Sequence, residues 1–144
     1  MIVLDTNVIS ETMRERPDEA VMRWLEGRPR ATLWTTAVTI AELAAAIARM
    51  PQGWKRGRFE EELAGMIAED FEGRILPFAT ASAVAYGRIR ATREVEGRPM
   101  GLADAQIAAM VAAAGATLAT RNVRDFSATG ITVVDPWTAV SSPD

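Results

Sequence analysis

The chain has 144 residues, of which 49% are hydrophobic and 24% are charged, with a net charge of −3 and neither histidine nor cysteine. These two absences exclude disulfides, nucleophilic enzymes that depend on a histidine base, and the common zinc sites. Carboxylate chemistry remains open, chiefly with oxygen-ligated Mg²⁺ or Mn²⁺, because Asp and Glu are hard donors.

The length favours one domain with a substantial core, and we expect residues 1–144 to form it. The N-terminus lacks a basic region followed by a long apolar one, so a secretory signal is not expected. The longest apolar stretch, 107–119, falls short of the ~20 residues that span a bilayer. We therefore expect a cytoplasmic protein with no membrane span.

The first half of the chain predicts two strand–helix units. Residues 2–4 are a short β-prone run, and a helical pattern follows at 8–13 and again from Pro17 to Gly27. Residues 32–36 predict a second strand, and a helix from Thr39 follows it, ending before Pro51.

The second half continues the alternation. Apolar spacing predicts a helix over 54–72, a short strand at 74–78 and a long helix that Thr80 caps and that runs to about residue 95. A break at 97–101 precedes a helix over 102–114, with Gly115 at its C-terminal cap, and the last two strands are expected at 117–120 and 131–134. Strands that alternate with helices imply an α/β protein, a three-layer α/β/α sandwich around a parallel sheet of about five strands.

Polar residues stand where these strands end or where the next helices begin, namely Asp5, Glu42, Asp104 and Asn122. Open parallel sheets bind ligands at this edge. Asp5 directly follows three core residues of a central strand, so its charge needs a partner or a metal to offset desolvation. If the acids meet, only a divalent cation between them makes their repulsion tolerable.

Three of these residues also have structural explanations. Glu42 fits a capping box with Thr39, and Asp104 in a first helical turn interacts favourably with the helix dipole. Asn122 is a common residue type where strands end. Against the structural explanation, Asp104 shares a stripe with apolar residues of its helix, so its carboxylate points along the buried face.

Four motifs in this order resemble those of the PIN-domain ribonucleases: Leu4-Asp5-Thr6-Asn7, Ala41-Glu42-Leu43, Leu102-Ala103-Asp104-Ala105-Gln106-Ile107-Ala108 and Thr120-Arg121-Asn122. Within that family the chain is most similar to the VapC and FitB toxins of bacterial toxin–antitoxin pairs. The resemblance implies a metal-dependent endoribonuclease with a single PIN-like domain, which hydrolyses RNA phosphodiesters with a metal-activated water.

The resemblance also implies roles for individual residues. Asp5 and Asp104 would bind Mg²⁺, or Mn²⁺ in its place, and Glu42 would complete the catalytic site. Thr6 and Thr120 would orient the carboxylates.

One position departs from the family pattern. Many relatives have a fourth acid where this chain has Asn122, which we still count among the catalytic residues because its carbonyl is a weaker, neutral ligand. Asp125 either reaches into the site from the following turn or caps the short helix at Phe126.

An acidic pocket repels RNA unless basic residues flank it. The candidate phosphate contacts are Arg121, Arg88, Arg124, Arg90 and the segment Trp54-Lys55-Arg56-Gly57-Arg58. The resemblance further implies a VapB-like antitoxin whose C-terminal segment fills the groove. It also implies a homodimer formed through the Ala-rich helices.

Two other functions stay open at this point. A PIN-like module that only binds RNA or protein is credible because of Asn122. A haloacid-dehalogenase-like phosphatase also uses an Asp after its first strand, but it needs a second Asp two positions on, where this chain has Asn7.

Overall fold

The structure is a computed structural model that describes residues 1–139. Within these residues, five parallel strands form one sheet in the order β3-β2-β1-β4-β5. The strands are β1 (Ile2–Leu4), β2 (Leu33–Thr36), β3 (Ile75–Leu76), β4 (Thr117–Ala119) and β5 (Thr132–Val134). Because β1 lies in the middle of the sheet, the residue that follows it stands at the centre of the carboxyl edge.

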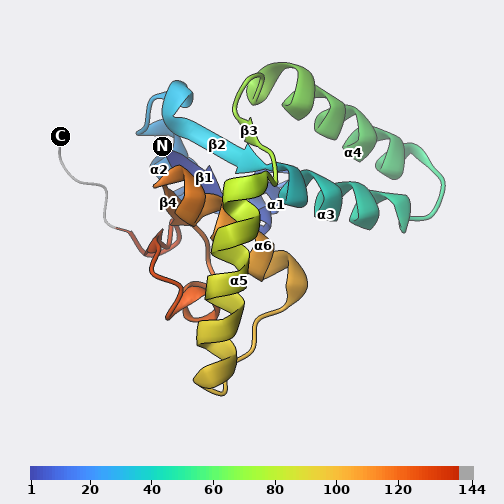
Figure 1. Ribbon diagram of the computed structural model, residues 1–144. Helices are drawn as coiled ribbons and strands as arrows, with labels where there is room; N and C mark the ends of the chain where they lie inside the picture. The colour runs from blue at the N-terminus through green and yellow to red at the C-terminus, as the bar shows by residue number, and fades with distance from the viewer. Residues whose placement is uncertain (140–144) are drawn as a thin grey trace.

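Helices connect the strands and cover the sheet (Figure 1). The α-helices are α1 (Thr6–Thr12), α2 (Glu19–Glu26), α3 (Ala37–Ala48), α4 (Trp54–Gly65), α5 (Thr80–Val95) and α6 (Leu102–Ala114). Short 3-10 helices span Arg30–Thr32 (η1) and Val123–Phe126 (η3), and a π-helix spans Met66–Asp70 (η2). None of the helices in residues 1–139 combines the length and the apolar character that crossing a membrane requires.

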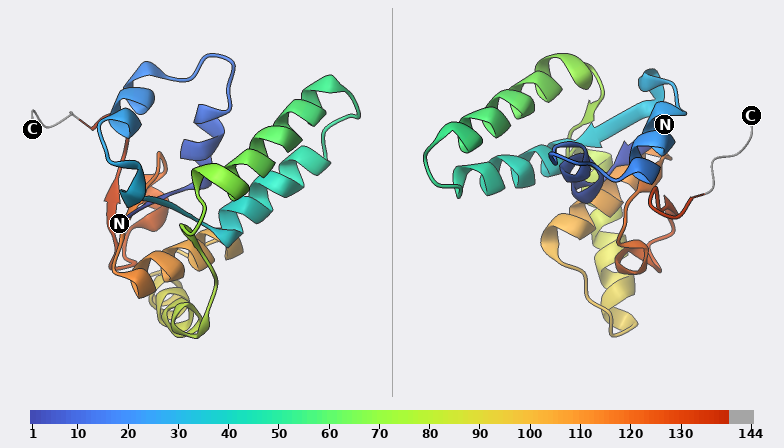
Figure 2. Two further views of the ribbon diagram at one scale, coloured as in Figure 1. Left: turned by 90° about the horizontal axis from the view of Figure 1, so that it is seen from above. Right: turned by 180° about the vertical axis from the view of Figure 1, so that it is seen from behind.

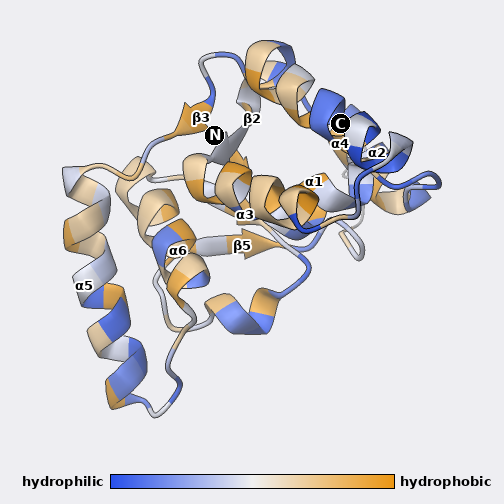
Figure 3. Cartoon of the chain, turned by 90° about the vertical axis from the view of Figure 1, so that its right-hand side faces the viewer, coloured by the Kyte–Doolittle hydropathy of each residue, from blue (hydrophilic) through white to orange (hydrophobic). Residues whose placement is uncertain are grey.

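Two apolar cores lie on opposite faces of the sheet, because successive strand residues point to opposite sides. Leu4 packs with buried residues of α1, α2 and α3, whereas the neighbouring Val3 packs with those of α5 and α6. Figure 2 shows α5 and α6 together on one side and the α3–α4 hairpin projecting from the other. Apolar residues cover most of α6, which lies between α5 and the rest of the chain (Figure 3). The predicted three-layer α/β/α architecture is confirmed.

Two elements of the middle segment differ from the prediction. The helix expected over 54–72 changes from α to π geometry after Gly65, and the N–H of Phe71 donates to the carbonyl of Met66 at 2.8 Å. β3 contains two residues instead of the five expected over 74–78, because Pro77 has no N–H to extend the ladder.

Two helix starts also differ. α1 begins at Thr6, two residues earlier than expected, because the carboxylate of Asp5 caps it. α5 begins at Thr80, but its N-cap is Ala79, so Thr80 is not the capping residue. The predicted C-terminal cap of α6 is confirmed at Gly115, whose φ of 61° is in the left-handed region that glycine tolerates.

Candidate active site

Asp5 forms the centre of a hydrogen-bonded cluster at the carboxyl edge of the sheet. Its side chain is 4% exposed. Oδ1 accepts from the backbone N–H of Thr6 at 2.8 Å, and Oδ2 accepts from the hydroxyl of Thr120 at 2.7 Å. The amide of Asn7 donates to the same Oδ2 at 3.4 Å. These bonds fix the carboxylate in one orientation, with Thr120 in the orienting position that the sequence predicts.

Glu42 reaches this cluster from α3, the helix that follows β2. The hydroxyl of Thr6 donates to its Oε1 at 2.6 Å, so Thr6 joins the two acids through its backbone and its side chain. The predicted capping box is wrong. The N–H of Thr39 donates to the hydroxyl of Thr36 at 3.0 Å, and this cap one turn earlier leaves the Glu42 carboxylate available to the site.

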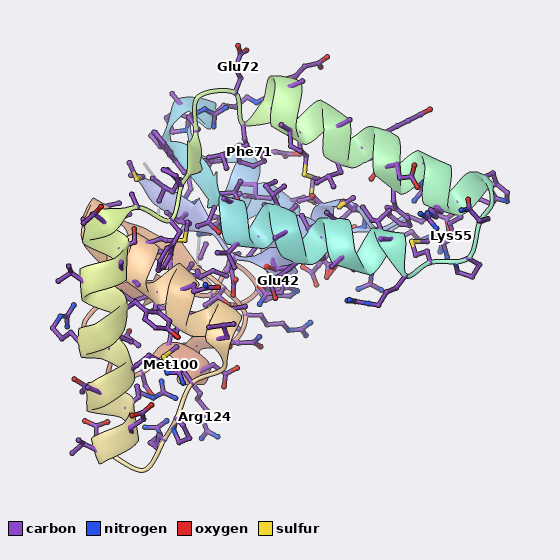
Figure 4. All side chains as sticks on the ribbon, turned by 45° about the vertical axis from the view of Figure 1, so that its right-hand side comes forward. Glu42, Lys55, Phe71, Glu72, Met100 and Arg124 are labelled. Atoms are coloured by element: carbon purple, nitrogen blue, oxygen red, sulfur yellow. The ribbon has the colours of Figure 1, made fainter. Side chains whose placement is uncertain are left out.

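Figure 4 shows Glu42 on the side of α3 that faces α6, where the third acid begins its helix. Asp104 lies in the first turn of α6 and is half-buried. Among residues 1–139, no hydrogen bond or ion pair reaches its carboxylate. The pKa of Asp104 is raised to about 6, chiefly by burial and then by the negative charges of Asp5, Asp125 and Glu42. Its position in the first turn also interacts favourably with the helix dipole. Asp104 therefore both stabilises the start of α6 and belongs to the acidic cluster.

The segment after β4 closes the site. The backbone N–H of Asn122 donates to the hydroxyl of Thr120 at 3.1 Å, and the amide of Asn7 donates to the same hydroxyl at 3.1 Å. The Asn7 carbonyl in turn accepts from the N–H of Arg121 at 3.1 Å. Asn7 therefore ties the first motif to the last, a role that the sequence reading did not assign to it.

Asp125 lies near the acids without lining the cavity between them. Its charge raises the pKa of both Asp5 and Asp104. The interpretation of Asp125 as a helix cap is wrong, because it lies inside η3, whose N-cap is Asn122. Its direct participation in the site stays a prediction.

The three acids and Asn122 line one open cavity of about 470 Å³. The structure thus brings together all four residues that the sequence analysis grouped. The cavity is completed by residues of α1, of the turn after it and of the loops that follow β4 and β5: Thr6, Asn7, Ser10, Glu11, Arg14, Arg121 and Trp137.

Besides Asn7, four of these lining residues were missed from the sequence. Ser10 and Glu11 follow Asn7 at helical spacing, so the 3.6-residue period of α1 was the signal that could have found them. Arg14 lies in the turn just after this helix. Glu11 is 5% exposed, and the exposed guanidinium of Arg14 contacts its carboxylate at 3.3 Å. Trp137 carried no such signal, because only the fold brings the C-terminal segment to the cavity.

The predicted phosphate contacts lie in different places. Arg121 lines the cavity, and its guanidinium stands over the Trp137 ring, 5.0 Å from the ring centroid. Arg88 on α5 and Arg124 in η3 are exposed and do not line this cavity, so their role stays a prediction. Lys55 lies at the far tip of the α3–α4 hairpin (Figure 4).

The chemistry of the donors fits a hard divalent cation. Burial raises the pKa of Asp5 despite the hydrogen bonds from Thr120 and Thr6, and the charges of Glu42 and Asp125 raise it further. This uncompensated negative charge is what Mg²⁺ or Mn²⁺ neutralises in carboxylate sites. Within residues 1–139, no three acids are close enough as they stand to form a ready-made metal cage. Hydrogen bonds fix the carboxylates of Asp5 and Glu42, whereas none among these residues holds that of Asp104.

Comparison with known proteins gives a consistent picture over nearly the whole chain. A family model described as PIN domain matches residues 2–131. The chain is 40% identical to the VapC ribonuclease Y4jK of Sinorhizobium fredii over 95% of this chain and 98% of the relative. It is 39% identical to the toxin FitB of Neisseria gonorrhoeae, over 95% of this chain and 99% of that protein. The solved structure of FitAB bound to an IR36 DNA fragment contains a chain that superposes with a TM-score of 0.91 at 36% identity, covering 98% of this chain and 99% of the other.

Proposed function

This chain belongs to the PIN-domain family, together with VapC ribonucleases and the FitB toxin, and from that premise we propose that it is a metal-dependent endoribonuclease and the toxin of a toxin–antitoxin pair. The observation that carries the proposal is the meeting of Asp5, Glu42 and Asp104 around one open cavity at the carboxyl edge of the sheet. The proposal takes residues 1–144 as a single domain.

Asp5 and Asp104 are the residues that would hold Mg²⁺, with Mn²⁺ able to substitute, and Glu42 would complete the set, directly or through water. The chemistry that such an ion supplies is a nucleophilic water at neutral pH and a positive charge beside the phosphate. Thr6 and Thr120 hold the carboxylates of Glu42 and Asp5 in place before substrate arrives. That pre-organisation lowers the cost of reaching the reactive geometry.

The rim of the cavity suits a nucleic acid strand. Arg121 and Arg14 place two guanidinium groups beside the acidic floor, and Arg binds phosphate through paired N–H groups. The indole of Trp137 packs partly against the core and lies beneath the Arg121 guanidinium, and a base can stack on the part of it that lines the cavity. This combination supports the proposed hydrolysis of an RNA phosphodiester in the cavity.

The proposal also includes protein partners and a location. A VapB-like antitoxin would cover the cavity and neutralise its acids. Support for this comes from relatives that are named toxins and from the FitAB assembly solved on DNA. A homodimer through the Ala-rich helices and a cytoplasmic location complete the proposal.

The phosphatase alternative loses its premise at position 7. The nucleophilic mechanism needs an acid there, whereas the amide of Asn7 donates to Thr120 and to Asp5 and so acts as a hydrogen-bond bridge. The binding-module alternative stays open to experiment.

The test is cleavage of a mixed panel of structured RNAs by purified, antitoxin-free protein in Mg²⁺ or Mn²⁺. Asp5→Asn removes one carboxylate of the site, and Glu60→Gln is the matched control, because Glu60 is an exposed carboxylate of α4 paired with Arg56. We expect cleavage by the wild type and the control, and none by Asp5→Asn, with RNA binding retained. RNA binding without cleavage by the folded wild type would favour the binding module.

A further inference from the structure

Arg93, near the end of α5, is a buried charge that the proposed function does not yet use. Its side chain is 5% exposed. Among residues 1–139 it forms no ion pair with a carboxylate. A guanidinium removed from water in this way is costly unless its N–H groups find acceptors.

Backbone carbonyls from two separate segments satisfy this guanidinium. Its Nε donates to the carbonyl of Arg98 at 2.6 Å, and its Nη1 donates to the carbonyls of Asp125 and Ser127, each at 2.8 Å. The first acceptor belongs to the connection between α5 and α6. The other two belong to the segment in and after η3, which lies beside α5 (Figure 1).

Both segments lead directly to the acidic cavity. The connection that contains Arg98 ends at Gly101, the N-cap of α6, and Asp104 lies in the first turn of that helix. The N–H of Asp125 donates to the carbonyl of Asn122 at 3.0 Å. Asp125, whose own carbonyl accepts from Arg93, is therefore bonded to a residue that lines the cavity. One side chain therefore connects the backbones that carry two of the candidate site residues.

Apolar packing already holds these segments against the core, through Met100 in the first and Phe126 in the second. Such packing is non-directional, whereas the planar fork of an arginine fixes the direction of each bond it makes. An apolar side chain at position 93 would add packing like that of Met100 and Phe126. A buried guanidinium instead fixes the position of one backbone segment relative to the other.

We infer that Arg93 is a positioning residue of the site: its guanidinium sets the start of α6, with Asp104, against the segment after β4, with Asn122. The effect of Arg93 on catalysis rests on the proposed ribonuclease function. Its effect on the position of the two segments rests on the hydrogen bonds alone. Arg93 does not line the cavity, so it acts through the residues that it places.

Three variants test the inference. Arg93→Gln removes the fork and the charge, and Arg93→Lys keeps the charge but cannot reproduce the planar fork. Arg98→Gln is the matched control, because it removes an exposed guanidinium of the same connection while leaving the backbone carbonyl that Arg93 uses.

The first measurement is amide hydrogen exchange of the free protein. In Arg93→Gln we expect residues 122–127 to exchange about tenfold faster or more, while the amides of β1 and α3 exchange as in the wild type. Arg93→Lys should show the same local effect to a smaller degree. Wild-type exchange in both Arg93 variants, or an equal acceleration across the whole chain, would overturn the inference.

The second measurement separates kcat from KM for RNA cleavage. Misplacement of catalytic groups by about 1 Å can cost on the order of 100-fold, so we expect kcat to fall about 10- to 100-fold in Arg93→Gln, with KM nearly unchanged. Arg98→Gln should keep the wild-type kcat. If Arg93→Gln does not fold, Arg93→Lys decides, and a wild-type kcat in that variant would overturn the positioning role. If the wild type itself cleaves no RNA, the proposed function fails separately, and the exchange experiment still tests the connection between the two segments.

Discussion

Replacing Asp104 with Asn should stabilise the metal-free protein at neutral pH, although it removes a residue of the site. The pKa of Asp104 is raised from 3.8 to about 6, first by burial and then by the charges of Asp5, Asp125 and Glu42. The folded protein therefore holds this proton more tightly than the unfolded chain does. Between pH of about 4 and about 6 unfolding releases the proton, so the contribution of Asp104 to stability falls as the pH rises through this window.

The size of the effect follows from the shift. A shift of about two pKa units corresponds to about 3 kcal/mol, and because Asp104 is only half-buried and solvent screens its charge, we expect about 1–2 kcal/mol. The Asn side chain has nearly the same volume and no charge, so Asp104→Asn should recover this energy.

Urea unfolding in EDTA, for wild type and variant at several pH values, measures the difference. We expect the two proteins to have nearly equal free energies of unfolding near pH 4, and the variant to become more stable as the pH approaches 7. Carboxylates remote from Asp104 titrate equally in both proteins and cancel, whereas the relief of repulsion with Asp5, Asp125 and Glu42 is part of the expected difference. A variant that is no more stable at pH 7, or a difference that does not change with pH, would refute the reasoning.

Three further predictions concern other parts of the site. Thr120→Val should lower the free energy of unfolding in urea by about 1–3 kcal/mol, because the buried hydroxyl donates to Asp5 and accepts from Asn7 and Asn122. Thr120→Ser keeps the hydroxyl and should recover most of the loss. Equal stability of the two variants would count against that role. Asn122→Asp should tighten Mn²⁺ binding several-fold in calorimetry, since it adds a charged ligand to the cavity wall, and an unchanged affinity would place the ion elsewhere. Trp137→Ala should raise KM for RNA about tenfold with little change in kcat, because it removes the ring that lines the cavity. The KM of Trp137→Phe should stay within about threefold of the wild-type value. An effect confined to kcat would exclude stacking as the main role of Trp137.

Local sequence patterns predicted the sheet and the grouping of the acids well. An apolar run followed at once by Asp5 indicated a central strand with a charge at its end, and the structure has that arrangement. Asp104 on an apolar stripe indicated a carboxylate away from the exposed face of its helix, and in the structure Asp104 is half-buried and lines the cavity. Both predictions depend on periodicity, which is a property of a single strand or helix.

The predicted capping box failed because two threonines near the start of α3 could each serve as its N-cap. Thr36 and Thr39 are both good N-caps three residues apart, and the end of β2 selects Thr36, which frees Glu42 for the site. The end of the strand at residue 36 was predicted correctly, so the step that failed was the choice of Thr39 over Thr36 as the N-cap.

Long-range packing explains the residues that were missed. No local pattern assigns a role to Arg93 or Trp137, because their contacts exist only once α5 and the C-terminal segment pack beside the site. The same limit applies to Arg88, whose helix and chain position say nothing about its distance from the cavity. A single sequence therefore predicts the acidic residues of the site better than the residues that surround them or hold them in position.

In the proposed mechanism, RNA hydrolysis at this site depends on a divalent cation held by Asp5 and Asp104. Cleavage of one RNA from the panel by wild-type protein, first in EDTA and then after addition of excess Mg²⁺, measures this dependence. We expect no cleavage in EDTA, with full recovery once Mg²⁺ exceeds the chelator. Cleavage that continues at the same rate in EDTA would contradict it.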